Sequence, residues 1–238
     1  MSPEVYSETI LNRDSNPIGN DDSVSDAAEL TSELTEDQAL SLLQQPDVTP
    51  QMLAQISKGP AAAKSRKVNL ALAMHPRTPR HISIPTLRRL FTFDLMHVTL
   101  TPVVPADIKR VAEEQIMNRL ESLSSGERMS LARRASGRVA AALLHDADSR
   151  VLQAALDNSH LVETFVVTAL MKHAAPESLF VAASEHLKWS QRREVQIALL
   201  RSEKTPLARA REMVKNFSAE SLRDIIPESR HAVLLEEI

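Results

Sequence analysis

Apolar and polar positions along the chain follow a helical period, and one short pattern recurs four times at nearly even spacing. Each copy opens with a charged residue and a valine, and the valines are Val68, Val111, Val151 and Val195, so the steps are 43, 40 and 44 residues. In three copies the residues at i+3 and i+4 complete one apolar helical face. A repeat of this length is typical of stacked helical units.

Each repeat has room for three helices, and helix breakers such as Pro102, Gly126 and Pro176 fall at the joints between them. The pattern predicts helices at 64–74, 79–91, 92–100, 105–122, 127–135, 137–145, 148–157, 161–173, 176–187, 190–200, 205–217 and 218–226. A capping-box pair, Thr35 and Gln38, predicts a short helix that begins after Thr35 and ends before Pro46, and another helix follows Thr49-Pro50. Residues 231–238 have the pattern of a final capping helix.

The dipeptide Thr-Pro occurs at Thr49-Pro50, Thr78-Pro79 and Thr205-Pro206. A threonine at the N-cap accepts a backbone N–H, and a proline at the next position has a preset φ and no N–H to leave unpaired. We therefore expect each pair to begin a helix. The last two pairs also lie ten residues after Val68 and Val195, which aligns these two repeats without a gap.

Two segments carry a resemblance to known repeat families. Asp148 to Leu156 resembles the HEAT and armadillo-like pattern of an acidic residue, Arg-Val and then alanines, and Val68 to Pro79 is similar to the leucine-rich-repeat variant. The resemblance implies an all-α fold, an α-solenoid of about four three-helix repeats with a curved surface. Such repeats serve adaptors, nucleic-acid readers and enzyme subunits alike, so it does not select a function.

Composition agrees with an all-α fold, because only 4 of 238 residues are glycine and 3% are aromatic. Cysteine is absent, which excludes disulfides, thiolate metal ligands and cysteine nucleophiles. The first residues lack the basic and apolar regions of a signal peptide, and no run reaches the roughly 20 apolar residues of a membrane span. We expect a cytoplasmic protein without membrane contact, and the sequence leaves its oligomeric state open.

Charge divides the chain unevenly, although the net charge is only −3. Residues 1–59 hold 2 basic and 11 acidic residues, residues 60–155 hold 15 and 8, and residues 156–238 hold 11 and 12. Residues 1–34 are polar and without helical period, so we expect a disordered acidic leader followed by a helical-repeat domain at 35–238. The acidic leader either shields a basic face or is a solvated tail, and we favour the second interpretation.

Candidate catalytic and metal-binding residues are few. His145 and Asp146, with Asp148 nearby, suggest a metal site, but no other histidine has ligand spacing, and Asp148 is better explained as the N-cap before Arg150. There is no Gly-x-Ser-x-Gly elbow, and the scattered glycines form no phosphate-binding loop. We therefore expect neither enzymatic activity nor a cofactor.

Basic residues at equivalent points of successive repeats are the main candidate site. Stacking would align them into one ladder: Arg66, Lys67, Lys109, Arg110, Arg150, Arg192 and Arg193. A row of like charges is unfavourable unless anions neutralise it. We favour internal pairing with Asp107, Glu113, Asp148 and Glu194, ahead of an acidic protein partner or the leader, and of nucleic acid.

The sequence therefore predicts a non-enzymatic helical-repeat scaffold that binds a protein partner on its curved surface. The alternative is a nucleic-acid-binding solenoid that uses the basic middle region 60–155. Its candidate residues are Arg66, Lys67, Arg77, Arg80, Arg88, Arg89, Lys109, Arg110, Arg133, Arg134 and Arg138. A net negative charge and few aromatic residues for base stacking disfavour it. The single tryptophan, Trp189, is expected to pack as a hydrophobic staple, and an exposed binding anchor is the alternative.

The leader prediction is testable by limited proteolysis. A non-specific protease should remove residues 1–34 early and leave a resistant remainder, because the leader lacks the apolar residues that offset chain entropy. Mass spectrometry of the time course identifies the cleavage sites. Protection of this segment would contradict the prediction and indicate that it docks on the folded part.

Overall fold

The computed structural model describes residues 34–45 and 47–226. Within them every regular element is a helix, fifteen α-helices and one short 3-10 helix, joined by turns and loops. In the first half lie α2 (Glu36–Leu43), α3 (Pro50–Lys58), α4 (Pro60–Lys64), α5 (Arg66–Met74), α6 (Arg80–Arg89), α7 (Thr92–Leu100), α8 (Ala106–Met117) and η1 (Leu120–Ser122). In the second half lie α9 (Ser125–Arg134), α10 (Gly137–Leu143), α11 (Ser149–Leu156), α12 (Glu163–Leu170), α13 (Glu177–Glu185), α14 (Arg193–Leu200), α15 (Leu207–Val214) and α16 (Ala219–Ile225). The all-α prediction is confirmed for this part of the chain.

The helices begin where the sequence supplies capping groups. Thr35 and Gln38 form the expected capping box of α2, and Ser124 and Glu127 form a second one at α9. The Asp148 side chain accepts a hydrogen bond from the backbone N–H of Arg150 at the start of α11. These caps satisfy N–H groups that a helix cannot pair internally, so they fix where each helix starts. All twelve helices expected between residues 64 and 226 are present as α5 to α16, with ends shifted by a few residues.

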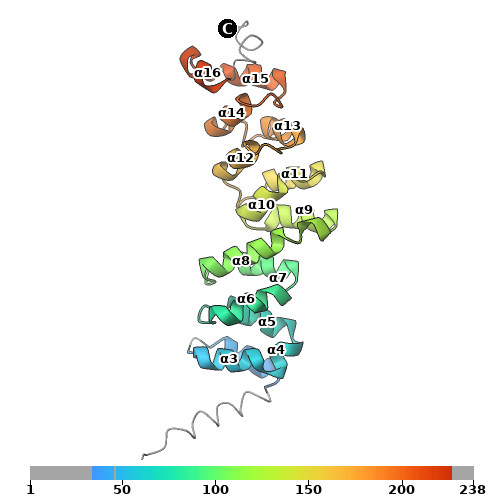
Figure 1. The fold of residues 1–238 in the computed structure, drawn as a ribbon, viewed down its shortest axis with the longest axis vertical. Coiled ribbons are helices and arrows are strands. Elements are labelled where there is room, and N and C mark those ends of the chain that lie inside the picture. Colours follow the sequence, from blue (N-terminus) through green and yellow to red (C-terminus); the bar gives the residue numbers. More distant parts are fainter. Residues whose placement is uncertain (1–33, 46, 227–238) are drawn as a thin grey trace, which may run out of the picture.

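The helices are arranged in two layers along an elongated stack (Figure 1). Consecutive helices, such as α5 and α6 or α7 and α8, pack across the layers. Helices two apart pack along them, with α6, α8, α10, α12 and α14 in one layer and α5 on α7, then α9, α11 and α13, in the other. Packing partners along a layer therefore recur after every second helix, whereas the sequence repeat spans three helices.

This alternation places successive copies of the sequence repeat in opposite layers. Val68 and Val151 lie on α5 and α11 in one layer, whereas Val111 and Val195 lie on α8 and α14 in the other. Val68, Val151 and Val195 are fully buried, as expected, but Val111 is only half-buried.

In the longer helix α8 the buried face is rotated. It consists of Ile108, Ala112 and Ile116, which lie four residues apart. Ala71, also expected in the core, is partly exposed at the edge of α5. The repeat thus marks the buried face in three of its four copies.

All three Thr-Pro pairs stand at the start of a helix, as expected, but the threonine caps that helix in only one of them. Thr49 does cap α3, because its side chain accepts a hydrogen bond from the backbone N–H of Met52. Thr78 and Thr205 instead lie one residue before the N-caps and are buried. The Thr78 hydroxyl donates to the carbonyl of Leu72 at 2.8 Å, and Thr205 donates to that of Leu199 at 2.6 Å. Both threonines therefore close the end of the preceding helix, the same contact in two aligned repeats.

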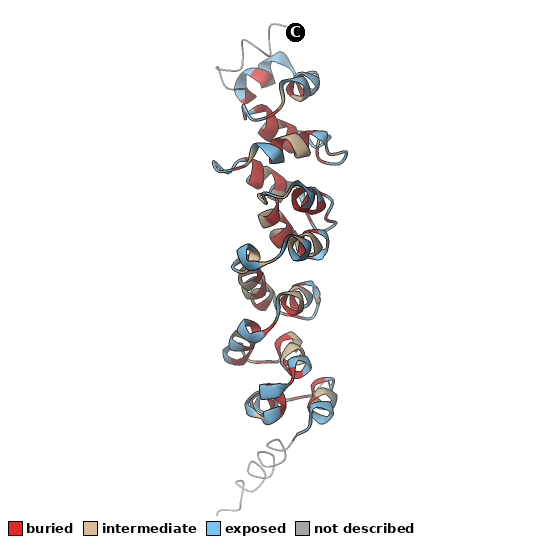
Figure 2. Ribbon diagram, turned by 90° about the vertical axis from the view of Figure 1, so that its right-hand side faces the viewer, coloured by how far each residue is buried: buried red, intermediate tan, exposed pale blue. Residues whose placement is uncertain are grey.

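Buried residues recur along the whole stack (Figure 2), and the apolar ones form two clusters. A smaller cluster joins α2 to α5 and includes Leu53 and Leu72, and a larger one runs from Ala73 to Ile226. Leu34, the first residue described, packs against the smaller cluster. The predicted leader, apart from Leu34, and the predicted capping helix at 231–238 lie outside the described residues.

Two substitutions of the same kind test the difference between the repeat copies. Val151→Asp should lower the free energy of unfolding by about 3 kcal/mol or more, because it places an unpaired carboxylate on the fully buried face of α11. Val111→Asp, at the half-buried equivalent position, should lower it by only about 1 kcal/mol. Urea unfolding followed by circular dichroism measures both. An equal decrease in the free energy of unfolding for the two variants would contradict the rotated buried face of α8.

Candidate functional site

The seven positions of the predicted ladder do not form one row. They lie on or beside α5, α8, α11 and α14, and these helices belong alternately to the two layers. Successive members of the predicted ladder therefore lie in opposite layers, because the sequence repeat spans three helices while the layer alternates with every helix. Whether any of these residues binds a partner stays a prediction.

Most of the seven side chains contact other parts of the protein. Arg66 makes two hydrogen bonds to Asp94, at 2.6 and 2.7 Å, and stacks on Phe91 with 4.9 Å to the ring centroid. Lys67 lies 3.7 Å from Glu36. On the second and last copies, Arg110 lies 3.6 Å from Glu114, and Arg193 stacks on Phe217 at 4.8 Å.

Internal pairing, the favoured interpretation of the basic residues, is therefore present, but largely with other partners than expected. Asp107 pairs with Arg80 at 2.9 Å, and Glu113 pairs with Arg138 at 3.7 Å. Of the four acidic residues expected to pair with the ladder, Asp148 does so, with Arg150.

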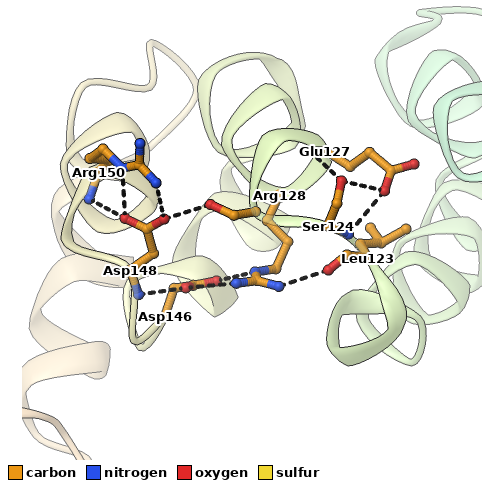
Figure 3. Close-up of polar contacts among 8 residues, drawn as sticks. Leu123, Ser124, Glu127, Arg128, Asp146, Asp148 and Arg150 are labelled. Atoms are coloured by element: carbon orange, nitrogen blue, oxygen red, sulfur yellow. Dashed lines mark hydrogen bonds and ion pairs between the residues drawn. The ribbon is translucent and has the colours of Figure 1, made fainter.

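The densest polar network joins α9 to the joint between α10 and α11 (Figure 3). Arg128 donates to Asp146 at 2.7 Å and to the carbonyl of Leu123 at 2.7 Å. The side chains of Arg128 and Asp146 are 23% and 7% exposed, so this is the most buried ion pair among the described residues. Asp146 also accepts a hydrogen bond from the backbone N–H of Asp148 at 2.9 Å, which holds the joint in place.

Asp148 is the second centre of this network (Figure 3). Its carboxylate accepts hydrogen bonds from Arg150 Nη2 at 2.9 Å, from the Ser125 hydroxyl at 2.5 Å and from the Arg150 backbone at 3.0 Å. The hydrogen bonds from the Arg150 side chain, followed by that from Ser125, hold the pKa of Asp148 well below its usual range. Asp148 therefore stays ionised down to strongly acidic pH and fixes the guanidinium of Arg150.

The hypothetical metal ligands are each engaged elsewhere. His145 Nε2 lies 3.2 Å from the carbonyl oxygen of Ala169, and burial, together with the charge of Lys172, lowers the pKa of His145. Asp146 and Asp148 face Arg128 and Arg150. Among the described residues no three His, Asp or Glu side chains gather in a way that could hold a metal ion.

Trp189 is buried, with 1% of its surface exposed, so the interpretation as an exposed binding anchor is wrong. Its indole N–H donates to the carbonyl of Leu156 at 2.8 Å, and Lys188 covers the ring, with Nζ 4.0 Å from the centroid. The side chain thus connects the end of α11 with the joint before α14. A buried tryptophan with a satisfied N–H is a packing residue.

Several cations of the basic middle region have no carboxylate partner among residues 34–45 and 47–226. They are Lys64, Arg77, Arg88, Arg89, Lys109, Arg119, Arg133 and Arg134. Arg119 has a structural role, since it donates to the carbonyls of Leu90 and Arg88 at the end of α6.

Two cavities adjoin this region. One, of about 360 Å³, lies beside the Arg128–Asp146 pair. The other, of about 420 Å³, lies between α9 and α11 and is lined by Arg133 and Arg150. Of its remaining lining residues, Met129, Gln153 and Asp157 carry no sequence pattern that marks a binding site, which is why the sequence analysis missed them.

Comparison with protein-family models, with curated proteins and with solved structures finds no match. The resemblance to HEAT, armadillo-like and leucine-rich-repeat-variant proteins therefore has no support beyond a helical architecture compatible with it. In the described part of the chain, every helix is too short or too polar to cross a lipid bilayer. The cytoplasmic location stays a prediction.

The lowered pKa of Asp148 predicts a pH-dependent contribution to stability. Since the folded-state pKa lies below the unfolded value of about 3.9, this contribution is complete above about pH 5 and is lost as the pH falls towards the folded-state pKa. Asp148→Asn, which retains a capping side chain, should lower the melting temperature at pH 7, and the difference from the parent should shrink below about pH 4.

Thermal unfolding between pH 2 and 7 measures this difference. Asp47→Asn is the matched control, because Asp47 is exposed between α2 and α3 and forms no ion pair with described residues. An Asp148→Asn difference that is constant over the whole pH range would refute the charge-based explanation.

Proposed function

We propose that this protein is a non-enzymatic scaffold or adaptor, a helical-repeat solenoid that binds a protein partner on the outer surface of its stack. The observation that carries the proposal is the elongated two-layer architecture, in which each helix uses one face for its neighbours and leaves the other exposed (Figure 2). A stack of this kind offers a long continuous surface relative to its size. Repeat architectures of this kind commonly use such surfaces for binding.

The polar networks support a structural rather than a catalytic role for the most buried charged groups. Arg128, Asp146 and Asp148 are tied to one another or to backbone groups around the α10–α11 joint. The Arg128–Asp146 pair joins α9 to this joint, and the other two hydrogen bonds hold local turns of the chain. The remaining chemistry available to a partner is therefore that of exposed side chains.

Nucleic-acid binding is the second candidate, and the basic middle region 60–155 is the observation that favours it. Of its eleven candidate cations, five are ion-paired with carboxylates of the chain, which lowers the positive potential that phosphates experience. The eleven are also distributed over both layers, on or beside α5, α6, α8, α9 and α10. A protein partner is the better supported of the two.

A salt titration separates the two candidates. Binding of fluorescently labelled duplex DNA, single-stranded DNA and RNA to the full chain should be weaker than about 1 μM at about 150 mM salt, because the net charge of −3 gives little long-range attraction. Tighter binding that falls steeply with salt, and is lost when Lys67, Lys109, Arg110 and Arg150 are changed to Ala, would establish the nucleic-acid function instead.

Support for the scaffold requires a defined complex. A partner that co-elutes with the full chain in fixed stoichiometry, and whose chemical cross-links map to exposed residues of the layers, is the expected result. Cross-links confined to residues 1–33 or 227–238 would place binding outside the stack and contradict the proposal.

A further inference from the structure

The pocket between α9 and α11 combines an apolar floor with two guanidinium groups. Met129 and Arg133 come from α9, and Arg150, Gln153, Ala154 and Asp157 come from α11. The residues on each helix are three or four positions apart, so they share one face of that helix. The cavity of about 420 Å³ lies within the roughly 300–1,000 Å³ typical of sites for small ligands or side chains.

The two arginines of this pocket differ in how they are held. Arg150 is fixed by Asp148 through Nε at 3.2 Å and Nη2 at 2.9 Å, which leaves Nη1 without an acceptor among the described residues. Its side chain is nevertheless 74% exposed. The network described above thus orients a donor that a ligand can still reach.

Arg133 carries an uncompensated charge at the other side of the pocket. Its contact within the described chain is with the sulfur of Met129, at 3.9 Å, and no described carboxylate pairs with it. Asp157, the acidic residue of the lining, has Oδ1 3.0 Å from His186 Nε2, and its side chain is 62% exposed. The lining therefore carries two guanidinium groups against one carboxylate.

We infer that this α9–α11 pocket binds an acidic segment of a partner protein. Carboxylates of the segment pair with Arg133 and with the free Nη1 of Arg150, and an aliphatic side chain between them packs on Met129 and Ala154. The inference rests on the proposed scaffold function and specifies the chemistry of its partner. The two guanidinium groups favour a ligand with carboxylates. The apolar part of the lining is Met129 and Ala154, and it contains no aromatic side chain on which a nucleic-acid base could stack, so it suits an aliphatic side chain better.

The test uses the full chain and a fluorescein-labelled probe peptide, Glu-Glu-Leu-Glu-Glu flanked by Gly-Ser, with Gln-Gln-Leu-Gln-Gln as the uncharged control. Fluorescence anisotropy at two salt concentrations measures affinity, which should be higher for the acidic peptide and fall with salt. Arg133→Gln should weaken binding about fivefold or more. A second single variant, Gln153→Glu on the exposed face of α11, adds a negative charge to the pocket and should also weaken binding of the acidic peptide relative to the parent.

Arg134→Gln is the matched control, because Arg134 is also exposed at the end of α9 but does not line the pocket. It removes the same charge and should change affinity by less than about twofold. Far-UV circular dichroism and melting temperature verify that each variant is folded. Binding that requires Arg133 but not Arg134 supports the pocket.

Three results would overturn the inference. They are equal losses for Arg133→Gln and Arg134→Gln, no difference between the acidic and neutral peptides, and binding of a single-stranded oligonucleotide in preference to the peptide. If a protein partner cross-links to the stack of the Arg133→Gln variant with unchanged affinity, the pocket does not bind that partner. The inference about the pocket is then refuted, but the proposed scaffold function is not.

Discussion

Packing of short helices against one another is the interaction on which the rest of this structure depends. The described α-helices run from 5 to 12 residues, and isolated helices of such length are marginal in water. They become stable by burying apolar residues against neighbouring helices, along the layer, across to the other layer, or both. The continuous cluster from Ala73 to Ile226 is the result, and it extends over most of the stack.

Hydrogen bonds from side chains to the ends of helices hold the stack in register. Asn158 is 1% exposed and donates to the carbonyls of Ala132 and Ala135 at 2.7 and 3.0 Å, so the loop after α11 closes the end of α9. Beside it, a Cβ atom at Gly137 would overlap the carbonyl oxygen of His160. Trp189 makes a comparable bond to the end of α11. Because the last carbonyls of a helix have no internal partner, such donors satisfy them while joining successive units.

The same organisation explains where the surface can carry function. Buried charges such as Arg128 and Asp146 serve the joints, and Asp148 both caps α11 and orients Arg150. Arg150 therefore belongs to a structural network on one side and to an exposed pocket on the other. This dual role allows a rigid helix pair to present a pre-oriented guanidinium, which reduces the entropy lost on binding.

The sequence by itself determined the helices and much of the core. Capping residues such as Thr35, Ser124 and Asp148 act over three residues or fewer, and the faces around Val68, Val151 and Val195 follow from helical geometry alone. Tertiary structure decided the grouping into pairs, the half-buried position of Val111 and the burial of Trp189. It also decided the pocket between α9 and α11, because charge pairing and layer assignment depend on contacts between residues far apart in the chain, which a local pattern does not encode.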